Sequence, residues 1–311
     1  MPAKRVVIAG GSGFVGRRLT RRLLSRKDLV TVLSRRPLEA RSGLPENVRI
    51  AGYTPTEDGP WFDELSRTDA VVCLAGEPVV GVRWSDAKKK EFEASRVAAC
   101  ATLVRAIERL PEAERPKVLV GASGVGFYGA HGPDEAIDET HQAGSDYMAH
   151  LAKRWEEALE PASALGVRVV HVRFGIVLGK GGGALQVMAR PFRMHVGGPI
   201  GSGKQMVSWI HIDDACGLIM LAIDRDDLKG PVNATSPNAV NMDRFAEAIG
   251  IILHRRSYLR VPDAAVRALF GEGAEPLLTG QRVVPRVAEK LGYDFAYPEL
   301  LPALESILGP N

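Results

Sequence analysis

The feature that most constrains the fold of this chain is a glycine-rich turn close to its N-terminus. An apolar, β-branched run at residues 5–9 predicts a buried strand, and Gly10, Gly13 and Gly16 follow it at G-x-x-G-x-x-G spacing. Apolar residues then recur at helical spacing from Val15. Gly10 would make the tight turn, Gly13 would let a pyrophosphate approach the backbone, and Gly16 would let the helix pack on the strand. This order predicts a nucleotide site, because free N–H groups at a helix N-terminus attract phosphate. The alternative is a turn that only joins strand to helix.

The end of the second predicted strand, at residues 29–33, bears on the choice of cofactor. It is followed by Ser34, Arg35 and Arg36. A chain that binds NAD usually has an acidic residue here to hold the ribose 2′-hydroxyl, whereas an arginine accommodates the 2′-phosphate of NADP. A hydroxyl followed by two guanidinium groups suits a phosphate. We therefore expect NADP(H) as the cofactor, and the alternative is a solvated basic turn.

Composition limits the class of protein. The 311 residues are 45% hydrophobic, which is enough for one α/β domain with an appendage or for two lobes. The net charge of +3 is spread along the chain, and its densest basic run, at residues 17–27, is typical of a solvated helix face rather than a nucleic-acid site. Three scattered cysteines indicate a reducing compartment and no metal site. We expect a cytoplasmic protein without a membrane partner, because no apolar run reaches spanning length and the fold begins at residue 5, leaving no room for a leader peptide.

Strands and helices alternate over the first two thirds of the chain. Strands are predicted at residues 5–9, 29–33, 48–51, 70–74, 117–120 and 167–172, and helices at 85–110, 147–165 and 215–222. This alternation predicts parallel strands with right-handed crossovers, and therefore a Rossmann-type doubly wound sheet. We expect a nucleotide-binding domain at residues 1–235, with a substrate-side excursion at about 181–206, and a small, mostly helical substrate-side domain at 236–311. Asp213 or Asp214 is the expected N-cap of the helix at 215–222.

Ligands of such a sheet bind outside the carboxyl ends of the strands, so the residues that follow each strand are candidates for chemistry. Leu74, Ala75 and Gly76 follow the fourth strand, and their small size would let a ribose lie close to the backbone. Ser123 follows the fifth strand. Ile176 lies just after the sixth.

Several segments, in order, carry a resemblance that covers nearly the whole chain. They are G-x-x-G-F-V-G at 10–16, ASRV at 94–97, GPIGSG at 198–203, SWIHIDD at 208–214, GQRVVP at 280–285 and GYDF at 292–295. The glycine spacing resembles the short-chain dehydrogenase/reductase superfamily, and the segments together resemble the uncharacterised epimerase family proteins of its extended branch. That group includes cell-division-inhibitor homologues and carries a C-terminal domain of unknown function.

The resemblance implies an NADP(H)-dependent epimerase, dehydratase or reductase, and it implies a set of cofactor contacts. These are Gly10, Gly13, Phe14, Val15, Ser34, Arg35, Leu74, Ala75, Glu91, Arg96 and Ile176.

One departure from the superfamily concerns proton transfer. Active members place a serine beside a Tyr-x-x-x-Lys pair, in which the lysine charge lowers the tyrosine pKa. Ser123 is present and Tyr147 begins the predicted helix, but position 151 is leucine. Lys153 lies about 240° around the helix from Tyr147 and cannot replace the missing cation. Tyr147 is therefore either the catalytic phenol or only an amphipathic helix residue, and Tyr128 is the alternative phenol.

The segment from Gly198 to Lys204 matches G-x-x-x-x-G-K, but it is not an ATPase loop. Gln205 replaces the Ser or Thr that binds Mg²⁺, and the residues that follow are typical of a strand rather than a helix. Arg193 and His195 are nearby, so we expect the loop to lie on the substrate side and to bind a carboxylate or phosphate. The alternative is a solvated basic loop.

Two functions of different class follow. The first is an NADP(H)-dependent enzyme that acts on a small polar substrate with an anionic group. The second is a non-catalytic NADPH-binding regulator or redox sensor, in which the missing lysine reflects lost chemistry. The substrate and the oligomeric state do not follow from the sequence.

Overall fold

The centre of the molecule is a seven-stranded parallel sheet, described here from a computed structural model that covers residues 2–309. The strand order is β11-β7-β5-β4-β1-β2-β3, and each neighbouring pair is parallel. The strands are β1 Arg5–Ala9, β2 Leu29–Ser34, β3 Arg49–Gly52, β4 Ala70–Cys73, β5 Val118–Gly124, β7 Arg168–Phe174 and β11 Gly230–Ala234. The chain runs outward from β1 to β3 and then outward on the other side from β4, so a ligand crevice lies between β1 and β4. The predicted Rossmann-type doubly wound sheet is confirmed.

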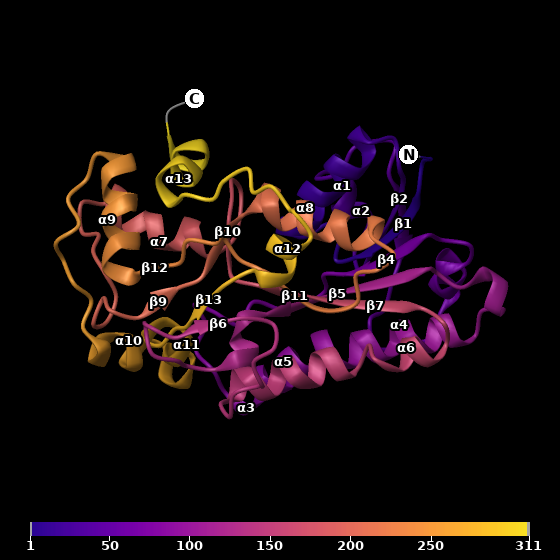
Figure 1. Ribbon diagram of the computed structural model, residues 1–311, viewed down its shortest axis with the longest axis horizontal. Helices are drawn as coiled ribbons and strands as arrows, with labels where there is room; N and C mark the ends of the chain where they lie inside the picture. Colours follow the sequence, from indigo (N-terminus) through magenta and orange to yellow (C-terminus); the bar gives the residue numbers. More distant parts are fainter. Residues whose placement is uncertain (1, 310–311) are drawn as a thin grey trace.

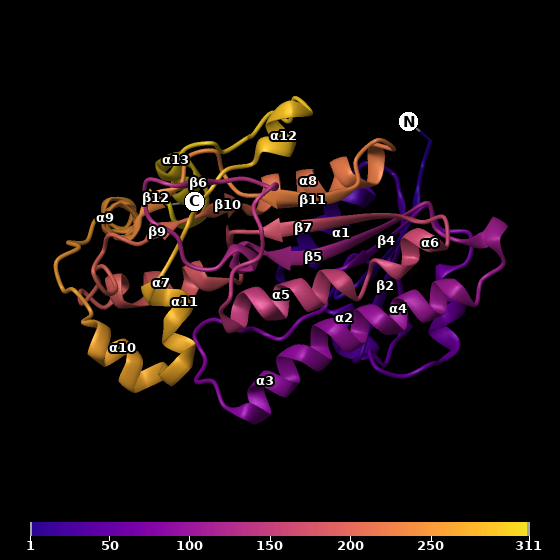
Figure 2. The same cartoon turned by 60° about the horizontal axis from the view of Figure 1, so that its bottom comes forward.

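Helices cover both faces of this sheet, because its central strands are apolar on both sides (Figures 1 and 2). Val6 and Ile8 of β1 pack with α1 (Phe14–Ser25) and α8 (Ile212–Asp224) in one core. Val7 and Ala9 lie in the opposite core with α4 (Ala99–Glu108), α5 (Tyr147–Glu157) and α6 (Pro161–Ala164). The sheet is therefore buried between two helical layers.

Of three helix predictions, the first is confirmed with an irregularity, and the other two need correction. The helix expected at residues 85–110 is α3 (Asp86–Glu93) followed by a π turn at Ala94–Ala98 and then α4. The helix expected at 147–165 divides into α5 and α6, and Pro161 begins the second part. The N-cap of α8 is His211, whose side chain accepts from the Asp213 N–H, so the expected Asp213 or Asp214 cap is wrong.

A smaller lobe lies beyond the carboxyl ends of β5 and β7 (Figure 2). Its core contains Trp209 and Phe245 and is shared by residues 178–209 and 242–307. The elements of the lobe are β8 Ile176–Leu178, α7 Ala184–Arg193, β9 Met206–Val207, β10 Trp209–His211, β12 Val240–Asn241, α9 Met242–Leu253, α10 Asp263–Phe270 and α13 Leu300–Leu308. Residues 178–209 and the C-terminal helices thus share one hydrophobic core.

The remaining elements connect these two parts. They are α2 Pro37–Arg41, β6 Ala136–Ile137, α11 Glu275–Leu278, β13 Arg282–Val283, α12 Arg286–Lys290 and short 3-10 turns at Pro60–Leu65, Glu112–Glu114, Val125–Tyr128 and Gly271–Ala274. Ala288 of α12 packs into the core of the sheet rather than of the lobe. The three cysteines are buried free thiols. Within residues 2–309, no helix combines the length and apolarity needed to cross a membrane.

Candidate active site

The glycine turn is built so that a phosphate group would meet backbone rather than side chains. Gly10 has φ +83°, and a Cβ there would lie 2.8 Å from the backbone N of Ala75. A Cβ on Gly16 would lie 2.3 Å from the Gly10 carbonyl oxygen, so only glycine allows the helix to approach the turn. Gly13 caps α1 without a side-chain hydrogen bond, and the first turn of α1 has no acidic residue. The positive helix end is therefore available to an anion.

The turn after β2 carries the residues expected to contact the ribose. The Ser34 hydroxyl accepts from the Arg36 N–H at 3.2 Å. The Arg35 guanidinium reaches across to the carboxylate of Glu77 at 3.0 Å, just after β4, and both side chains are exposed to solvent. The pair thus spans from the end of β2 to the end of β4, across the end of β1, and there Arg35 can exchange its carboxylate partner for a phosphate.

The π turn directs Arg96 into the interior beneath this crevice. Its guanidinium donates to the Glu77 carbonyl at 2.7 Å and to the Ser95 hydroxyl, and it stacks over the Trp155 ring. A Cβ on Gly76 would lie 3.1 Å from its central carbon. Burial lowers the pKa of Arg96 to about 10, which leaves the group charged at neutral pH. Glu91, by contrast, is exposed and pairs with Lys88, so its cofactor contact stays a prediction.

Phe14 and Ile176 lie where the sheet and the smaller lobe meet. A Cβ on Gly182 or Gly183 would lie less than 3.0 Å from the Phe14 ring, which explains the glycine run after β8. Val15 packs against the core of the sheet. Ile176 begins β8, lies in register with Trp209 of β10 and lines the cavity described below.

A buried polar network lies behind Ser123. The Ser123 hydroxyl, at the end of β5, donates to Glu156 of α5 at 2.7 Å. Glu156 also accepts two hydrogen bonds from Arg173 at the end of β7, at 2.8 and 2.7 Å. Arg173 donates to the Tyr128 hydroxyl at 2.9 Å, which in turn donates to Asn233 at 2.7 Å. The sequence did not predict Glu156 or Arg173 as site residues. Its only signal was that a charged residue, Arg173, lies at the end of an apolar strand.

The three candidate catalytic residues are placed differently. Ser123 and Tyr147 line a common cavity, whereas Tyr128 does not appear in its wall. Burial raises the pKa of the Tyr128 hydroxyl to about 12, and both of its hydrogen-bonding directions are taken by Arg173 and Asn233. Ser123 and Tyr147 are therefore the pair that a substrate can reach.

Tyr147 lies in the wall of this cavity, with the Lys89 ammonium 5.2 Å from the centre of its ring. Its hydroxyl donates to the Lys89 carbonyl at 3.3 Å, and its ring packs edge-on against Trp84. Burial raises the pKa of Tyr147, and the Glu93 carboxylate raises it further, against the opposing charge of Arg96. Leu151, at the position of the missing lysine, is buried in a cluster with Trp84 and Phe92. An apolar side chain thus occupies the position at which active superfamily members carry the lysine.

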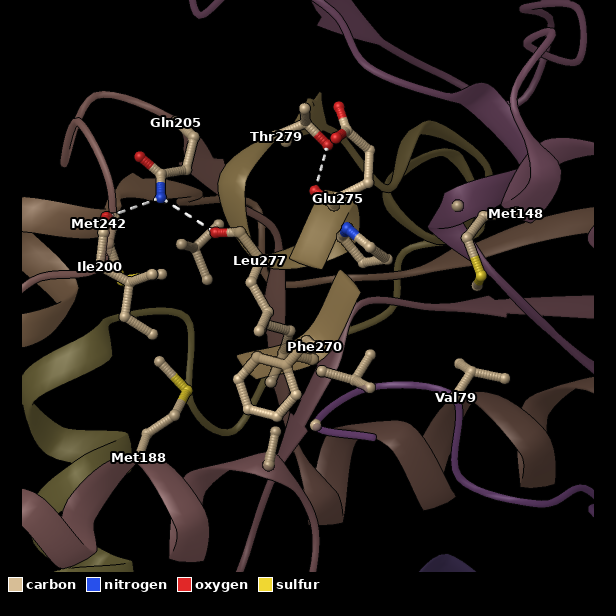
Figure 3. Close-up of a pocket in the computed structure, with 18 of the residues that line it drawn as sticks. Val79, Met148, Met188, Ile200, Gln205, Met242, Phe270, Glu275, Leu277 and Thr279 are labelled. Atoms are coloured by element: carbon tan, nitrogen blue, oxygen red, sulfur yellow. Dashed lines mark hydrogen bonds between the residues drawn. The ribbon is translucent and has the colours of Figure 1, made fainter. Parts of the chain in front are cut away.

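The cavity has a volume of about 740 Å³ and is lined by Ser123 at the end of β5, by Phe174 at the end of β7 and by residues of the lobe. Figure 3 shows several of these lobe residues. Of the loop cations expected on the substrate side, Arg193, His195 and Lys204 are exposed, and none of them lines it. The segment after Lys204 is the strand β9, as expected for a loop that is not an ATPase loop. Within residues 2–309, no three potential metal ligands come together.

Comparison with known proteins identifies relatives of this chain. A family model described as the NAD dependent epimerase/dehydratase family matches residues 6–235, and a domain of unknown function, DUF1731, matches residues 261–307. The chloroplastic epimerase family protein SDR39U1 homolog of Arabidopsis thaliana is 40% identical over 303 residues, which cover 97% of this chain and 86% of the relative. The epimerase family protein YfhF of Bacillus subtilis is 34% identical, and the match covers 97% of each chain.

Solved structures agree with this relationship. The crystal structure of human epimerase family protein SDR39U1 with NADPH has a TM-score of 0.85 and 35% identity, covering 98% of this chain and 99% of the human chain. The UDP-glucose 4-epimerase of Thermus thermophilus in complex with NAD has a TM-score of 0.75 at 18% identity, covering 94% of each chain, and this likeness concerns the fold alone.

Proposed function

The chain belongs to the NAD dependent epimerase/dehydratase family, and from this premise we propose that it is an NADP(H)-dependent oxidoreductase. The reaction is the reduction of a carbonyl group, or the reverse oxidation of an alcohol. The observation that carries the proposal is that Ser123 and Tyr147 line one cavity at the carboxyl edge of the sheet, where ligands of this fold bind.

The cofactor preference rests on this chain's own residues and on one relative. Arg35 and Ser34 suit a 2′-phosphate, and the glycine turn has no room for side chains where a pyrophosphate would lie. The human relative was crystallised with NADPH. The residues that would hold the cofactor are Gly10, Gly13, Phe14, Val15, Ser34, Arg35, Leu74, Ala75, Gly76, Glu91, Arg96 and Ile176.

Bound NADPH supplies a hydride with its electron pair, and the protein must supply the proton. Tyr147 is the donor, because it lines the cavity and its phenol carries a proton at neutral pH. That proton is directed to the Lys89 carbonyl and turns to the substrate oxygen when the substrate binds. In the structure the Ser123 hydroxyl donates to Glu156, so its oxygen can accept a hydrogen bond from the hydroxyl of an alcohol substrate. A ketone oxygen only accepts, so in the reduction the Ser123 hydroxyl turns from Glu156 and donates to that oxygen. The Glu156–Arg173 pair fixes the resting orientation of Ser123. Ser123 thus positions the reacting oxygen and Tyr147 protonates it.

The regulator remains the second candidate, and one observation favours it. Leu151 is buried where active superfamily members carry the lysine, so the usual cation beside the phenol is absent from this position. A regulator would bind NADPH tightly without turnover.

Substitution of the two hydroxyl residues tests the proposal. Ser123→Ala and Tyr147→Phe should each lower kcat about 10²–10⁴-fold and leave NADPH affinity unchanged, as expected for loss of a positioned acid or its orienting group. Consumption of NADPH at 340 nm measures the first effect, and isothermal titration measures the second. Tyr258→Phe, which removes an exposed phenol, is the matched control. Full turnover in both test variants would remove Ser123 and Tyr147 from the mechanism, and loss of turnover in Tyr128→Phe alone would move the role to Tyr128.

A further inference from the structure

The walls of the cavity beyond Ser123 and Tyr147 are mostly apolar. Side chains from several distant segments of the lobe and of the sheet edge meet there (Figure 3). Four of the seven methionines in the chain line this one space: Met148, Met188, Met206 and Met242. Methionine is flexible and polarizable, and such side chains adapt to apolar ligands of irregular shape.

The polar side chains in the wall of the lobe are bonded to the protein itself. Gln205 donates to the carbonyls of Ile200 and Leu277 at 2.9 and 3.1 Å (Figure 3). Thr279 donates to the Glu275 carbonyl at 2.8 Å, and the Gln281 side chain donates to the Val125 carbonyl at 2.7 Å. These donors are therefore committed before any ligand enters, and they leave a wall that binds by apolar contact.

The charges around the cavity provide no site for an anionic ligand. Among the described residues that line it, Arg96 is the one cation, and it is bonded to the Glu77 carbonyl. Two carboxylates line the cavity as well: Asp146, which caps α5, and Glu275, which pairs with Arg267. A carboxylate or diphosphate placed in the lobe would lose water without gaining a free cation, which is unfavourable. The anionic substrate expected from the Gly198–Lys204 loop thus finds no matching charge there.

The mouth of the cavity is apolar too. Val187 and Leu269 belong to the wall and are 68% and 64% exposed, on α7 and α10 respectively. Val196 and Val261 are also part of the wall and are exposed to solvent. An apolar molecule would meet apolar surface from the entrance to the reacting end.

We propose that the substrate is an elongated, uncharged, apolar molecule that carries its carbonyl or alcohol group at one end. The polar end meets Ser123 and Tyr147, and the apolar body fills the lobe between α7, α9 and α10. This inference rests on the proposed function and names the substrate class of that same site.

A homologous series of neutral ketones, from 2-butanone to 2-dodecanone, tests the proposal in the presence of NADPH. We expect kcat/KM to rise about fourfold for each added methylene until the cavity is filled. The ketone 11-oxododecanoate, which matches 2-dodecanone in length but ends in a carboxylate, should be at least about a hundredfold poorer. Equal or better turnover of the carboxylate, or no dependence on chain length, would overturn the proposal.

Binding separates this inference from the proposed function. The neutral dye Nile red should bind the NADPH-loaded protein, and 2-dodecanone should displace it at a concentration at least about tenfold lower than 11-oxododecanoate does. Selective displacement without turnover would contradict the proposed reaction and support the apolar site. Equal displacement by both ketones, or failure of the dye to bind, would overturn the apolar site.

A charged residue introduced into the cavity wall, with a matched control on the same helix, gives a second test. Met188→Glu should weaken 2-dodecanone binding about ten- to a hundredfold without changing NADPH affinity. Arg190→Gln makes the same change in charge on the same helix, outside the wall, and should alter neither affinity by more than about twofold. Met188→Gln, a neutral change of similar size, gives the same test should the glutamate variant fail to fold. Unchanged binding in a folded Met188 variant would contradict the proposal.

Discussion

At the scale of a single residue, we propose that Arg35 determines the cofactor preference. In the structure its guanidinium pairs with Glu77, and both groups lie at the surface. An exposed pair of this kind contributes little to stability, so Arg35 is free to bind a phosphate instead. The identity of this residue, and its place after β2, could be predicted from the sequence because the glycine motif fixes where β2 ends relative to the crevice. Its pairing with Glu77 could not, because the two residues belong to different strand ends.

Arg35→Ala should weaken NADPH about ten- to a hundredfold and barely change NADH, because only NADPH carries the 2′-phosphate that the guanidinium binds. Isothermal titration of both cofactors measures the change. Arg49→Ala removes an exposed cation of the next strand, paired with Glu64, and serves as the control. If the native protein binds NADH as tightly as NADPH, the prediction that the residues after β2 select NADP(H) is wrong.

If Tyr147 is the proton donor, as we propose, the reaction has a pH dependence whose sign follows from the burial of this side chain. Burial raises the pKa of Tyr147, so the phenolate that must accept a proton in the oxidation is scarce at neutral pH. We expect kcat/KM for oxidation of the alcohol product with NADP⁺ to rise about tenfold per pH unit without a plateau below about pH 10, while reduction changes little near neutral pH. A plateau of the oxidation rate near pH 7 would show that another group is the base.

At the scale of elements, long-range contacts decide details that local patterns leave open. The strand β1 has the predicted bounds, because an apolar run followed by glycine is a local signal. The π turn at 94–98 was not predicted, since it leaves the apolar periodicity of the helix nearly intact while it redirects Arg96. The α8 cap was assigned to the wrong residue because the usual capping carboxylates have distant partners. Asp213 pairs with Arg18 of α1, and Asp214 accepts from the N–H groups of Ala296 and Tyr297.

His211 makes the stability of α8 depend on pH. Its Nδ1 must be unprotonated to cap the helix, and its ring packs against Tyr297 and Ser306. Burial lowers the pKa of His211, while Asp213 and Asp214 oppose that shift. Because the pKa is lower in the folded state, the unfolded chain binds more protons, and stability falls as the pH drops below about 6.5.

Chemical unfolding between pH 5 and 8 should show this loss, of about 1 kcal/mol for the cap. His211→Asn keeps a capping side chain that does not titrate, so its unfolding free energy should vary less over the same range. His254→Asn changes an exposed histidine in left-handed conformation at the end of α9 and should keep the native dependence. An unchanged slope in His211→Asn would assign the acid sensitivity to other groups.

At the scale of the whole molecule, the fold was predicted and the cavity was not. Alternating strands and helices specify the sheet through local patterns and crossover handedness. The cavity is formed by side chains from segments as distant as Val79, Leu151, Met188 and Leu277, which only the tertiary fold brings together. The loop cations were expected to face the substrate, but the fold turns them to solvent and lines the space with methionine and aliphatic residues. The shape and polarity of the cavity are therefore properties of the assembled lobe.

We propose that this cavity is a site of hydride transfer. The direct measurement uses NADPH deuterated at the transferred position, incubated with the protein and 2-dodecanone, followed by mass spectrometry of the alcohol formed. The predicted result is one deuterium in the product of the native protein and an amount about 10²–10⁴-fold lower with Tyr147→Phe under the same conditions. Tight NADPH binding with no deuterium in the product of this or any other ketone in the series would contradict the claim and leave the regulator as the function.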